Sequence, residues 1–316
     1  MVFTAFAPAK VNLYLHLIGR RPDGYHLLDS LIAFADIGDR ITAEPATTLS
    51  LEITGPEAAG LADLGQDNLV LRAARLLVAH TGTARGAALS LEKNLPIAAG
   101  IGGGSSDAAA ALRLLTALWQ LSIDEEALRI LGARLGADLP ACLYRRAAWL
   151  GGVGERIEPA SDLPEAGILL ASPRKQLPTA AVFAARTGPF YEAGRFAPMP
   201  RDAAGLARTL TALRNDLTDA AIGLVPEIAA VLARLSRLPG ALLARMSGSG
   251  ATCFALFPDR GAAEEARAAL AAAEPQWWCA AGGLVGGETV AGQALEFPVR
   301  REITGKNRFR IGVISK

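Results

Sequence analysis

The sequence predicts an α+β protein of two domains, and three observations carry this prediction. Its 316 residues correspond to about two domains of roughly 150 residues each. Apolar residues make up 51% of the chain and charged residues 20%, which is typical of a folded protein and excludes a disordered one. Segments with the period of a strand and segments with the period of a helix interleave within each half of the chain.

Charge and cysteine content narrow the classes of function. A net charge of +1 gives no broad basic field, so we expect no nucleic-acid partner. The three cysteines match neither a disulfide framework nor metal-ligand spacing, which indicates a reducing cytoplasm. No apolar run reaches the roughly 18 residues of a membrane span, and no basic-then-apolar signal segment opens the chain, so we expect no membrane association.

The first predicted element is a strand over residues 10–18, where two sets of side chains alternate. The core set is Val11, Leu13, Leu15 and Leu17, and the opposite set is Lys10, Asn12, Tyr14 and His16. This alternation places Lys10 and Asn12 side by side on a polar face. His16, like His80, is interpreted as a solvated polar residue.

The next elements are predicted from periodicity and capping residues. A turn over 19–24 leads into extended chain over 25–35, and further strands are expected over 49–53 and 87–91. Asp67 is predicted to cap a helix that runs to about His80. Ser122 with Glu125 forms a capping-box pattern for another helix, which Gly136 closes.

The most informative segment is the glycine-serine loop at residues 95–107. Four glycines and two serines run directly into a helix, whose packed face is predicted to comprise Ala108, Ala111, Leu112, Leu115 and Trp119. Glycines allow successive backbone N–H groups to turn toward one point, and the helix N-terminus adds its own N–H groups and positive dipole end. The pattern predicts a phosphate cradle that is neither the Walker loop nor the dinucleotide fingerprint. The alternative is a flexible turn before a helix.

The second half follows the glycines at 151–154. Strands are predicted over 168–171 and 251–257, the latter entered through the Ser-Gly-Ser-Gly segment 247–250. Helices are predicted over 226–235, with proline in the first turn, and over 262–273. The basic tail 300–316 lacks convincing periodicity, so no element is predicted there.

Three separated segments resemble the signature motifs of the GHMP small-molecule kinases. They are Pro-Ala-Lys-Val-Asn-Leu at 8–13, the glycine-serine loop at 96–107 and Met-Ser-Gly-Ser-Gly-Ala at 246–251. The resemblance implies an N-terminal ribosomal-protein-S5-like nucleotide-binding domain over 1–156 and a C-terminal ferredoxin-like domain over 157–299. The tail 300–316 has no counterpart in the family.

Two further segments narrow the resemblance within the family. Arg-Pro-Asp-Gly-Tyr-His at 21–26 and Gly-Ala-Asp-Leu-Pro at 136–140 are similar to segments of the members that act on 4-diphosphocytidyl-2-C-methyl-D-erythritol. The resemblance implies transfer of phosphate from ATP, with Mg²⁺, to the 2-hydroxyl of this small molecule, in the non-mevalonate route to isoprenoid precursors. It indicates neither an oligomeric state nor protein ligands for the metal.

The resemblance also assigns residues to the nucleotide and to catalysis. The expected nucleotide-binding residues are Pro96, Ala98, Gly100, Gly102, Gly103, Gly104, Ser105 and Ser106. Asp138 is the expected acceptor of the hydroxyl proton, and a cation at Lys10 would favour its charged form. Local sequence alone favours a helix cap for Asp138 and an exposed strand position for Lys10. The role of Asp107, in the first helical turn, is left open.

The acceptor is expected to contact four residues. Asn12 would orient it, Tyr25 and His26 resemble the cytosine-binding pair of the family, and Phe183 stands where the family has a second aromatic residue. Ordinary core packing is the alternative for Phe183, and capping is a sufficient explanation for Asn215 and Asp216. Two other functions are weighed: a family member acting on homoserine or mevalonate, and a catalytically silent nucleotide-binding relative.

Overall fold

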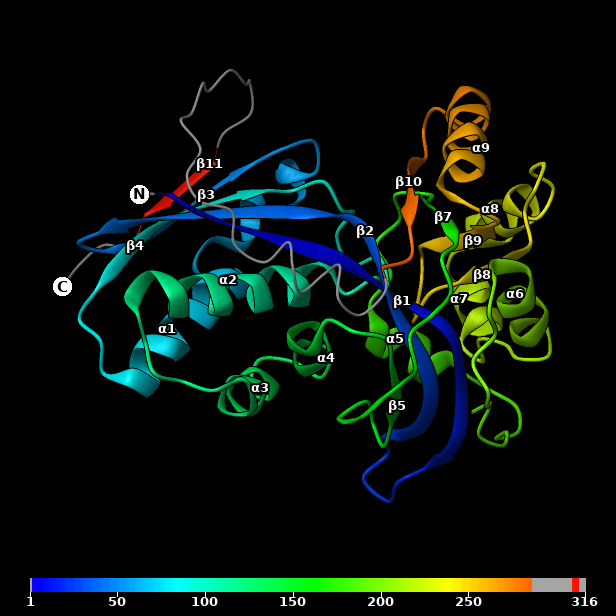
Figure 1. Cartoon of the computed structure of the whole chain (residues 1–316), viewed down its shortest axis with the longest axis horizontal. Helices are drawn as coiled ribbons and strands as arrows, with labels where there is room; N and C mark the ends of the chain where they lie inside the picture. Colours follow the sequence, from blue (N-terminus) through cyan, green and yellow to red (C-terminus); the bar gives the residue numbers. More distant parts are fainter. Residues whose placement is uncertain (1, 286–308, 313–316) are drawn as a thin grey trace.

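The computed structural model describes residues 2–285 and 309–312, which form two sheets with helices packed against them (Figure 1). The larger sheet has the order β11-β3-β4-β2-β5-β6, and β1 pairs with β2. Its strands are β1 (Phe3–Arg20), β2 (His26–Ala46), β3 (Leu49–Thr54), β4 (Gly86–Glu92), β5 (Ala148–Gly151), β6 (Arg156–Pro159) and β11 (Phe309–Gly312). Neighbouring strands are antiparallel except β3 and β4, which are parallel. The strands predicted over 10–18, 25–35, 49–53 and 87–91 are confirmed.

The helical elements of this half are the 3₁₀ segment η1 (Ala58–Asp67), α1 (Leu69–Thr81), α2 (Gly103–Trp119), α3 (Glu125–Ala133) and α4 (Leu139–Tyr144). Helix α2 packs on β1 and β2 and α1 packs on β3, whereas α3 and α4 pack against α1 and α2, on the side away from the sheet (Figure 1). Helix α2 follows the glycine loop as predicted, and every residue of its predicted packed face is buried. The indole N–H of Trp119 donates to the carbonyl of Gly86 at 3.1 Å, so the far end of α2 is fixed to β4.

The smaller sheet has the antiparallel order β10-β7-β9-β8. Its strands are β7 (Gly167–Ser172), β8 (Leu243–Met246), β9 (Cys253–Phe257) and β10 (Trp278–Gly283), and the helices of this half are α5 (Thr179–Ala185), α6 (Ala203–Thr211), α7 (Thr218–Leu224), α8 (Glu227–Leu235) and α9 (Arg260–Ala273). The α+β class and the four elements predicted here are confirmed. Within the described residues, no helix is both long and apolar enough to cross a membrane.

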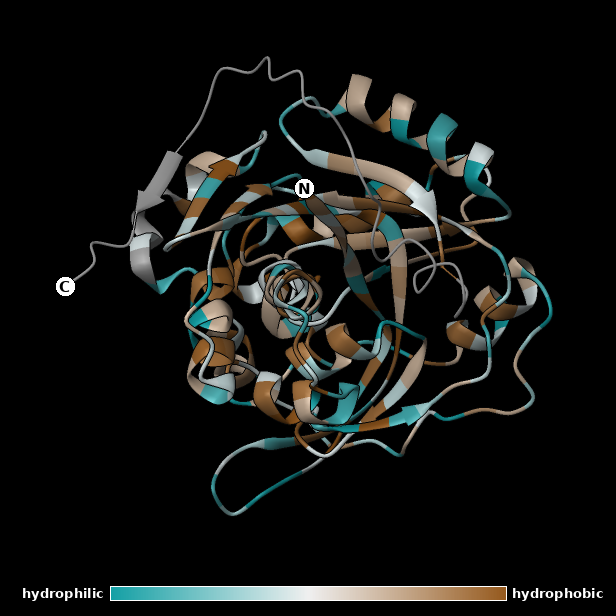
Figure 2. Ribbon diagram, turned by 60° about the vertical axis from the view of Figure 1, so that its left-hand side comes forward, coloured by the Kyte–Doolittle hydropathy of each residue, from teal (hydrophilic) through white to brown (hydrophobic). Residues whose placement is uncertain are grey.

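The hydrophobic core is continuous between the two sheets. Val11 and Leu13 of β1 share one buried cluster with Ile168, Leu170 and Phe254 of the smaller sheet. Apolar stretches of ribbon gather in the interior and hydrophilic stretches at the peripheral loops (Figure 2). Strand β6 pairs with β5 and extends the larger sheet past the boundary expected after residue 156.

Strand β1 differs from its predicted alternation. The pairing of β1 with β2 shifts register between Asn12 and Tyr14, so Leu13 is an extra residue in the strand. Such a bulge reverses which side chains share a face. Val11 and Leu13 therefore pack in one buried cluster and Leu15 in the other. The prediction of one uniform core face is wrong, and Leu15 lines the same cavity as Lys10 and Asn12.

The prediction that His16 is solvated is also wrong. Its side chain is buried. Nδ1 lies 2.9 Å from the carbonyl oxygen of Glu192, and Nε2 accepts a hydrogen bond from the backbone N–H of Arg214. His80 is exposed, as expected. The difference arises because the loops around 192 and 214 cover β1, a contact that local sequence does not contain.

Two helix caps lie beside the predicted ones. Asn68, not Asp67, caps α1 by accepting from the N–H of Val70. Asp124, not Ser122, caps α3, which ends at Ala133, before Gly136. Each true cap is the residue immediately before its helix, where a short polar side chain reaches an unpaired N–H group.

One segment of the tail 300–316, for which the sequence predicted no helix or strand, forms a strand. Residues 309–312 form β11, which pairs antiparallel with β3 (Phe309 opposite Ile53). The sequence predicted no element there, because pairing partners for so short a strand come from elsewhere in the chain. Residues 300–308 and 313–316 of the predicted tail lie outside the described residues.

Candidate active site

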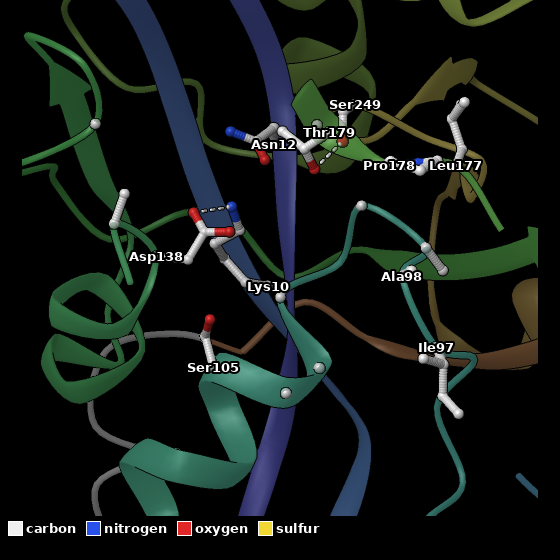
Figure 3. A pocket seen from close by; sticks show the side chains of 18 of the residues that line it. Lys10, Asn12, Ile97, Ala98, Ser105, Asp138, Leu177, Pro178, Thr179 and Ser249 are labelled. Carbon is white, nitrogen blue, oxygen red and sulfur yellow. Dashed lines mark hydrogen bonds and ion pairs between the residues drawn. The ribbon is translucent and has the colours of Figure 1, made fainter. Parts of the chain in front are cut away.

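A cavity of about 500 Å³ brings together segments that are far apart in the sequence (Figure 3). Its lining includes the residues predicted for the site at Lys10, Asn12, Pro96, Ala98, Gly100, Gly102, Gly103, Gly104, Ser105, Asp138 and Phe183. Three predicted site residues lie outside this lining: Tyr25, His26 and Ser106. The structure thus gathers the glycine loop, strand β1 and the start of α4 around one space.

The glycine loop has a backbone that turns sharply into α2. Ala98, Gly100 and Gly102 have φ values of 50°, 74° and 63°, in the left-handed region. Gly102 is the residue immediately before α2. The first N–H groups of a helix have no intrahelical partner, and the first three residues of α2, Gly103, Gly104 and Ser105, line the cavity. This arrangement suits an anionic group.

Two of the glycines differ in the space around them. A Cβ at Gly100 would lie 2.6 Å from the carbonyl oxygens of Ser247 and Gly250, so only glycine permits this close contact. A Cβ at Gly104 would meet no atom within 4 Å. Gly104 therefore leaves part of the cavity open, whereas Gly100 lets two loops touch.

Ser247 fixes the glycine loop from the opposite side. Its hydroxyl donates to the carbonyl of Gly100 at 3.0 Å and accepts from the N–H of Asn12 at 3.1 Å. The N–H of Lys10 donates to the carbonyl of Ile101 at 3.0 Å. The loop is consequently held between β1 and the segment that enters β9.

Lys10 and Asp138 form an ion pair in the cavity, with Nζ of Lys10 2.8 Å from Oδ1 of Asp138 (Figure 3). The side chain of Lys10 is 5% exposed and that of Asp138 is 45% exposed. Asp138 stands at the N-cap position of α4, but its side chain makes no capping hydrogen bond. The helix-cap and exposed-lysine alternatives do not describe these two residues.

Asn12 is held in one orientation beside Lys10. Its Nδ2 donates to Oγ of Ser30 at 2.8 Å, and that hydroxyl donates to the carbonyl of Tyr14 at 2.5 Å. Asn12 is buried and lines the cavity. The chain of hydrogen bonds ties the amide to β1 and β2, so its position at the cavity is fixed by the sheet.

The two loop serines have different places. Ser105 lines the cavity. Ser106 is buried, its hydroxyl donates to the carbonyl of Pro8 at 2.7 Å, and its N–H donates to the carbonyl of Gly102. Both donor groups of Ser106 are thus used within the protein, and they fasten the start of α2 to β1.

An aromatic cluster lies next to the cavity. The ring of His26 is 5.5 Å from the ring of Phe183 and 6.1 Å from that of Phe190. Burial lowers the pKa of His26 below its ordinary value, and the positive charges of Arg20 and Arg186 lower it further. The imidazole is therefore uncharged at neutral pH. Tyr25 is 64% exposed.

Asn215 does not cap α7: the N-cap residue of that helix is Leu217, and no side chain makes a capping hydrogen bond there, so the capping interpretation is wrong. Oδ1 of Asn215 accepts from the N–H of Leu217, in a turn that precedes the helix. Its Nδ2 donates at 2.8 Å to the carbonyls of both Met246 and Gly248. Asn215 thus links the start of α7 to the loop that holds the glycine loop. Its only sequence signal is the Asn-Asp pair.

Two models of one protein family match this chain. The family model described as GHMP kinases N terminal domain matches residues 68–146, and the model described as GHMP kinases C terminal matches residues 197–276. The first match includes the glycine loop and Asp138, and the second includes Gly248 and Ser249, which line the same cavity. Both belong to the family that the motifs resemble.

Two proteins that are similar to this chain over most of its length have the same enzyme name. A protein of Paramagnetospirillum magneticum named 4-diphosphocytidyl-2-C-methyl-D-erythritol kinase is 53% identical over 278 residues, covering 88% of this chain and 97% of that protein. A Rhodospirillum rubrum protein with the same name is 49% identical over 280 residues, covering 89% and 92%.

Solved structures agree with these relatives. A crystal structure of 4-(cytidine 5'-diphospho)-2C-methyl-D-erythritol kinase superposes with a TM-score of 0.72 at 37% identity, covering 90% of this chain and all (100%) of that one. Homoserine kinase from Cytophaga hutchinsonii superposes with a TM-score of 0.66 at 16% identity, covering 90% and 95%, which shows a shared fold.

Proposed function

The chain belongs to the GHMP kinases and, among them, to the 4-diphosphocytidyl-2-C-methyl-D-erythritol kinases, and on this basis we propose the reaction at its cavity. The enzyme transfers the γ-phosphoryl group of ATP to the 2-hydroxyl of 4-diphosphocytidyl-2-C-methyl-D-erythritol. The products are ADP and the 2-phosphate ester. This is the kinase step of the non-mevalonate route to isoprenoid precursors.

The Lys10–Asp138 ion pair is the observation that carries the proposal. It lies in the same cavity as the N-terminus of α2, so a carboxylate and an ammonium group stand beside a site for anions. A protein that only bound nucleotide would need the loop but no carboxylate to activate a hydroxyl. The pair therefore favours a kinase over a catalytically silent relative.

Each member of the pair has a distinct task in phosphoryl transfer. One carboxylate oxygen of Asp138 accepts the proton of the acceptor hydroxyl as the oxygen attacks the γ-phosphorus. Lys10 holds that carboxylate in place and stabilises negative charge that develops on the attacking oxygen. Asn12 orients the acceptor alcohol. Phosphoryl transfer depends mainly on such positioning and charge compensation.

The glycine loop holds the nucleotide in this proposal. Backbone N–H groups of Gly103, Gly104 and Ser105 bind phosphate oxygens, and the Ser105 hydroxyl adds a donor. Pro96, Ala98, Gly100 and Gly102 shape the wall of the site, and Ser106 secures the start of α2. No group of three or more His, Cys, Asp or Glu side chains that suits a metal occurs among the described residues. Mg²⁺ that enters with the nucleotide would supply positive charge to the transferred phosphate.

The aromatic cluster receives the cytosine of the acceptor. His26 offers an uncharged imidazole to the edge of the base, and the rings of Tyr25 and Phe183 offer stacking faces. Phe183 lines the cavity and touches His26, so it connects the base site to the reacting hydroxyl.

The remaining assignments follow from the family. We assign residues 1–156 and 157–299 to the N- and C-terminal GHMP kinase domains; β6 crosses this boundary, and β11, in the tail 300–316, adds a strand to the larger sheet. The three free cysteines are consistent with a cytoplasmic enzyme. Its substrates are small molecules, and no nucleic acid or membrane enters the reaction.

Acceptor choice tests the proposed function. ADP release should be rapid with 4-diphosphocytidyl-2-C-methyl-D-erythritol and should stay at the background rate with homoserine or mevalonate, since neither of these carries a base for the aromatic cluster. ADP release that is faster with homoserine or mevalonate than with 4-diphosphocytidyl-2-C-methyl-D-erythritol would refute the proposed substrate.

His26→Ala tests base recognition separately from chemistry. We expect KM for the cytidylyl substrate to rise, with kcat and the KM for ATP much less affected, because the lost contact is common to ground and transition states. A uracil analogue should be a poor substrate of the native enzyme, since its edge leaves polar groups of the site unpaired. His80→Ala, an exposed histidine on α1, is the matched control. Equal use of cytosine and uracil substrates, with an unchanged KM in His26→Ala, would remove His26 from this role.

A further inference from the structure

Three charged side chains form a buried cluster beneath the glycine loop. Nζ of Lys93 lies 2.5 Å from Oδ2 of Asp39 and 2.7 Å from Oδ2 of Asp107. Their side chains are 2%, 0% and 3% exposed, respectively. Burial opposes the charged ammonium, but the two carboxylates raise the pKa of Lys93 above its ordinary value, so the lysine stays charged. The catalytic proposal uses none of these residues.

The position of the cluster in the chain links it to the loop. Lys93 follows the last residue of β4, and Asp107 lies in α2, so the two residues flank the glycine loop on its two sides. Their ion pair joins the segment that enters the loop to the helix that leaves it. Asp39, on β2, attaches this junction to the sheet.

Backbone contacts strengthen the same junction. Oδ1 of Asp39 accepts from the N–H groups of Asn94 and Leu95, at 2.6 and 2.8 Å. The segment immediately after Lys93 is thereby fixed to β2. On the other side, a Cβ at Gly103 would lie 3.2 Å from Nζ of Lys93, so the first residue of α2 packs directly on the ammonium group.

We propose that Lys93 is a positioning residue for the nucleotide, which sets the spacing between the entry of the glycine loop and the start of α2 through its bond to Asp107. This inference rests on the proposed function, since it assumes that the loop binds ATP phosphates. The N–H groups of a phosphate site act together only if the backbone is held in register. A buried ion pair to a sheet-anchored lysine supplies that register.

Asp107→Ala is the direct test. The variant keeps the Lys93–Asp39 pair and places a strong helix former in α2, so it should fold. We expect calorimetry to show ATP binding weakened by about tenfold, because a loosened phosphate site loses aligned donors. The KM for the acceptor should stay close to that of the native enzyme, since Lys93 and Asp107 line the same cavity but bond to each other and to Asp39 rather than to Lys10, Asn12 or Asp138.

Two variants separate positioning from general stability. Asp107→Asn retains an oxygen that accepts from Lys93, and it should restore most of the ATP affinity. Asp29→Ala removes another buried carboxylate, which accepts hydrogen bonds from Tyr14 and Arg195 and has none with the glycine loop. ATP affinity should not change in this variant. Equal weakening by Asp29→Ala and Asp107→Ala would contradict the proposal, as would an Asp107→Asn variant that binds ATP no better than Asp107→Ala.

A third variant covers the case in which Asp107→Ala does not fold. Gly103→Ala points its Cβ at Lys93 and Leu95 and suits a helix, so it displaces the ammonium without removing a charge. It should also weaken ATP binding while the melting temperature is maintained. Native affinity in folded Gly103→Ala would overturn the proposal. Failure of the native enzyme itself to bind ATP would instead refute the proposed function, so the two failures are distinguishable.

Discussion

Asp138→Asn is expected to lower turnover by about 10²–10⁴-fold, the usual contribution of a positioned general base. The amide keeps the shape of the carboxylate and an oxygen for Lys10, but it accepts the proton of the acceptor hydroxyl poorly. ATP affinity should change little, because Asp138 is assigned to the acceptor alcohol. Steady-state kinetics and ATP calorimetry on the same preparation measure the two effects.

Asp124→Asn is the matched control for that substitution. Asp124 caps α3, the helix before α4, and asparagine caps equally well, so kcat should be unchanged. A smaller loss in Asp138→Asn would indicate that the carboxylate mainly orients the hydroxyl, as expected for a loose transition state. Turnover close to native in a folded Asp138→Asn variant would rule out both roles.

Gly104→Val is expected to weaken ATP binding by about a hundredfold, since a displaced phosphate loses one or two hydrogen bonds to a charged group, each of about 1.5–3 kcal/mol. The added side chain enters space in which no protein atom lies within 4 Å, so it meets the phosphates rather than the protein. The melting temperature should not fall, because valine is a better helix former than glycine. Calorimetry with ATP and a thermal melt give the two readings.

Gly223→Val in α7 is the matched control for the loop variant. Gly223 is also helical and exposed, and its Cβ would also meet nothing within 4 Å. It lies outside the lining of the cavity, so ATP affinity should be native. If Gly104→Val bound ATP as well as Gly223→Val does, the glycines would serve only the turn.

The parts of the site that the sequence predicted are those whose chemistry is local. A run of glycines before a helical pattern implies a loop that presents N–H groups, and the cavity is lined by that loop. Lys10 and Asn12 are two residues apart on one strand, and both line the cavity as their spacing predicted. Asp138 could be placed only by resemblance, since its local sequence equally suits a cap.

The parts that sequence reasoning missed depend on contacts between distant segments. The β1 bulge at Leu13 could not be predicted from the alternation of apolar and polar residues. Every residue from Val11 to Leu17 is buried, so the polar residues of this strand do not mark a solvent face. Lys93 looks like an ordinary lysine at a strand end, and only the fold brings Asp39 and Asp107 to it. Asn215 suggests a helix cap in the sequence, but in the fold it bonds instead to the loop before β9.

The destination of the phosphoryl group tests the central claim most directly. In a single-turnover reaction, γ-labelled ATP is bound to excess enzyme and 4-diphosphocytidyl-2-C-methyl-D-erythritol is then added. The label should be transferred to the acceptor at the same rate as ADP forms. Phosphorus NMR of the product should show a phosphate ester at the 2-position. Label recovered only as inorganic phosphate, or an ester at another hydroxyl, would contradict the assignment of Lys10, Asp138 and the glycine loop to this reaction.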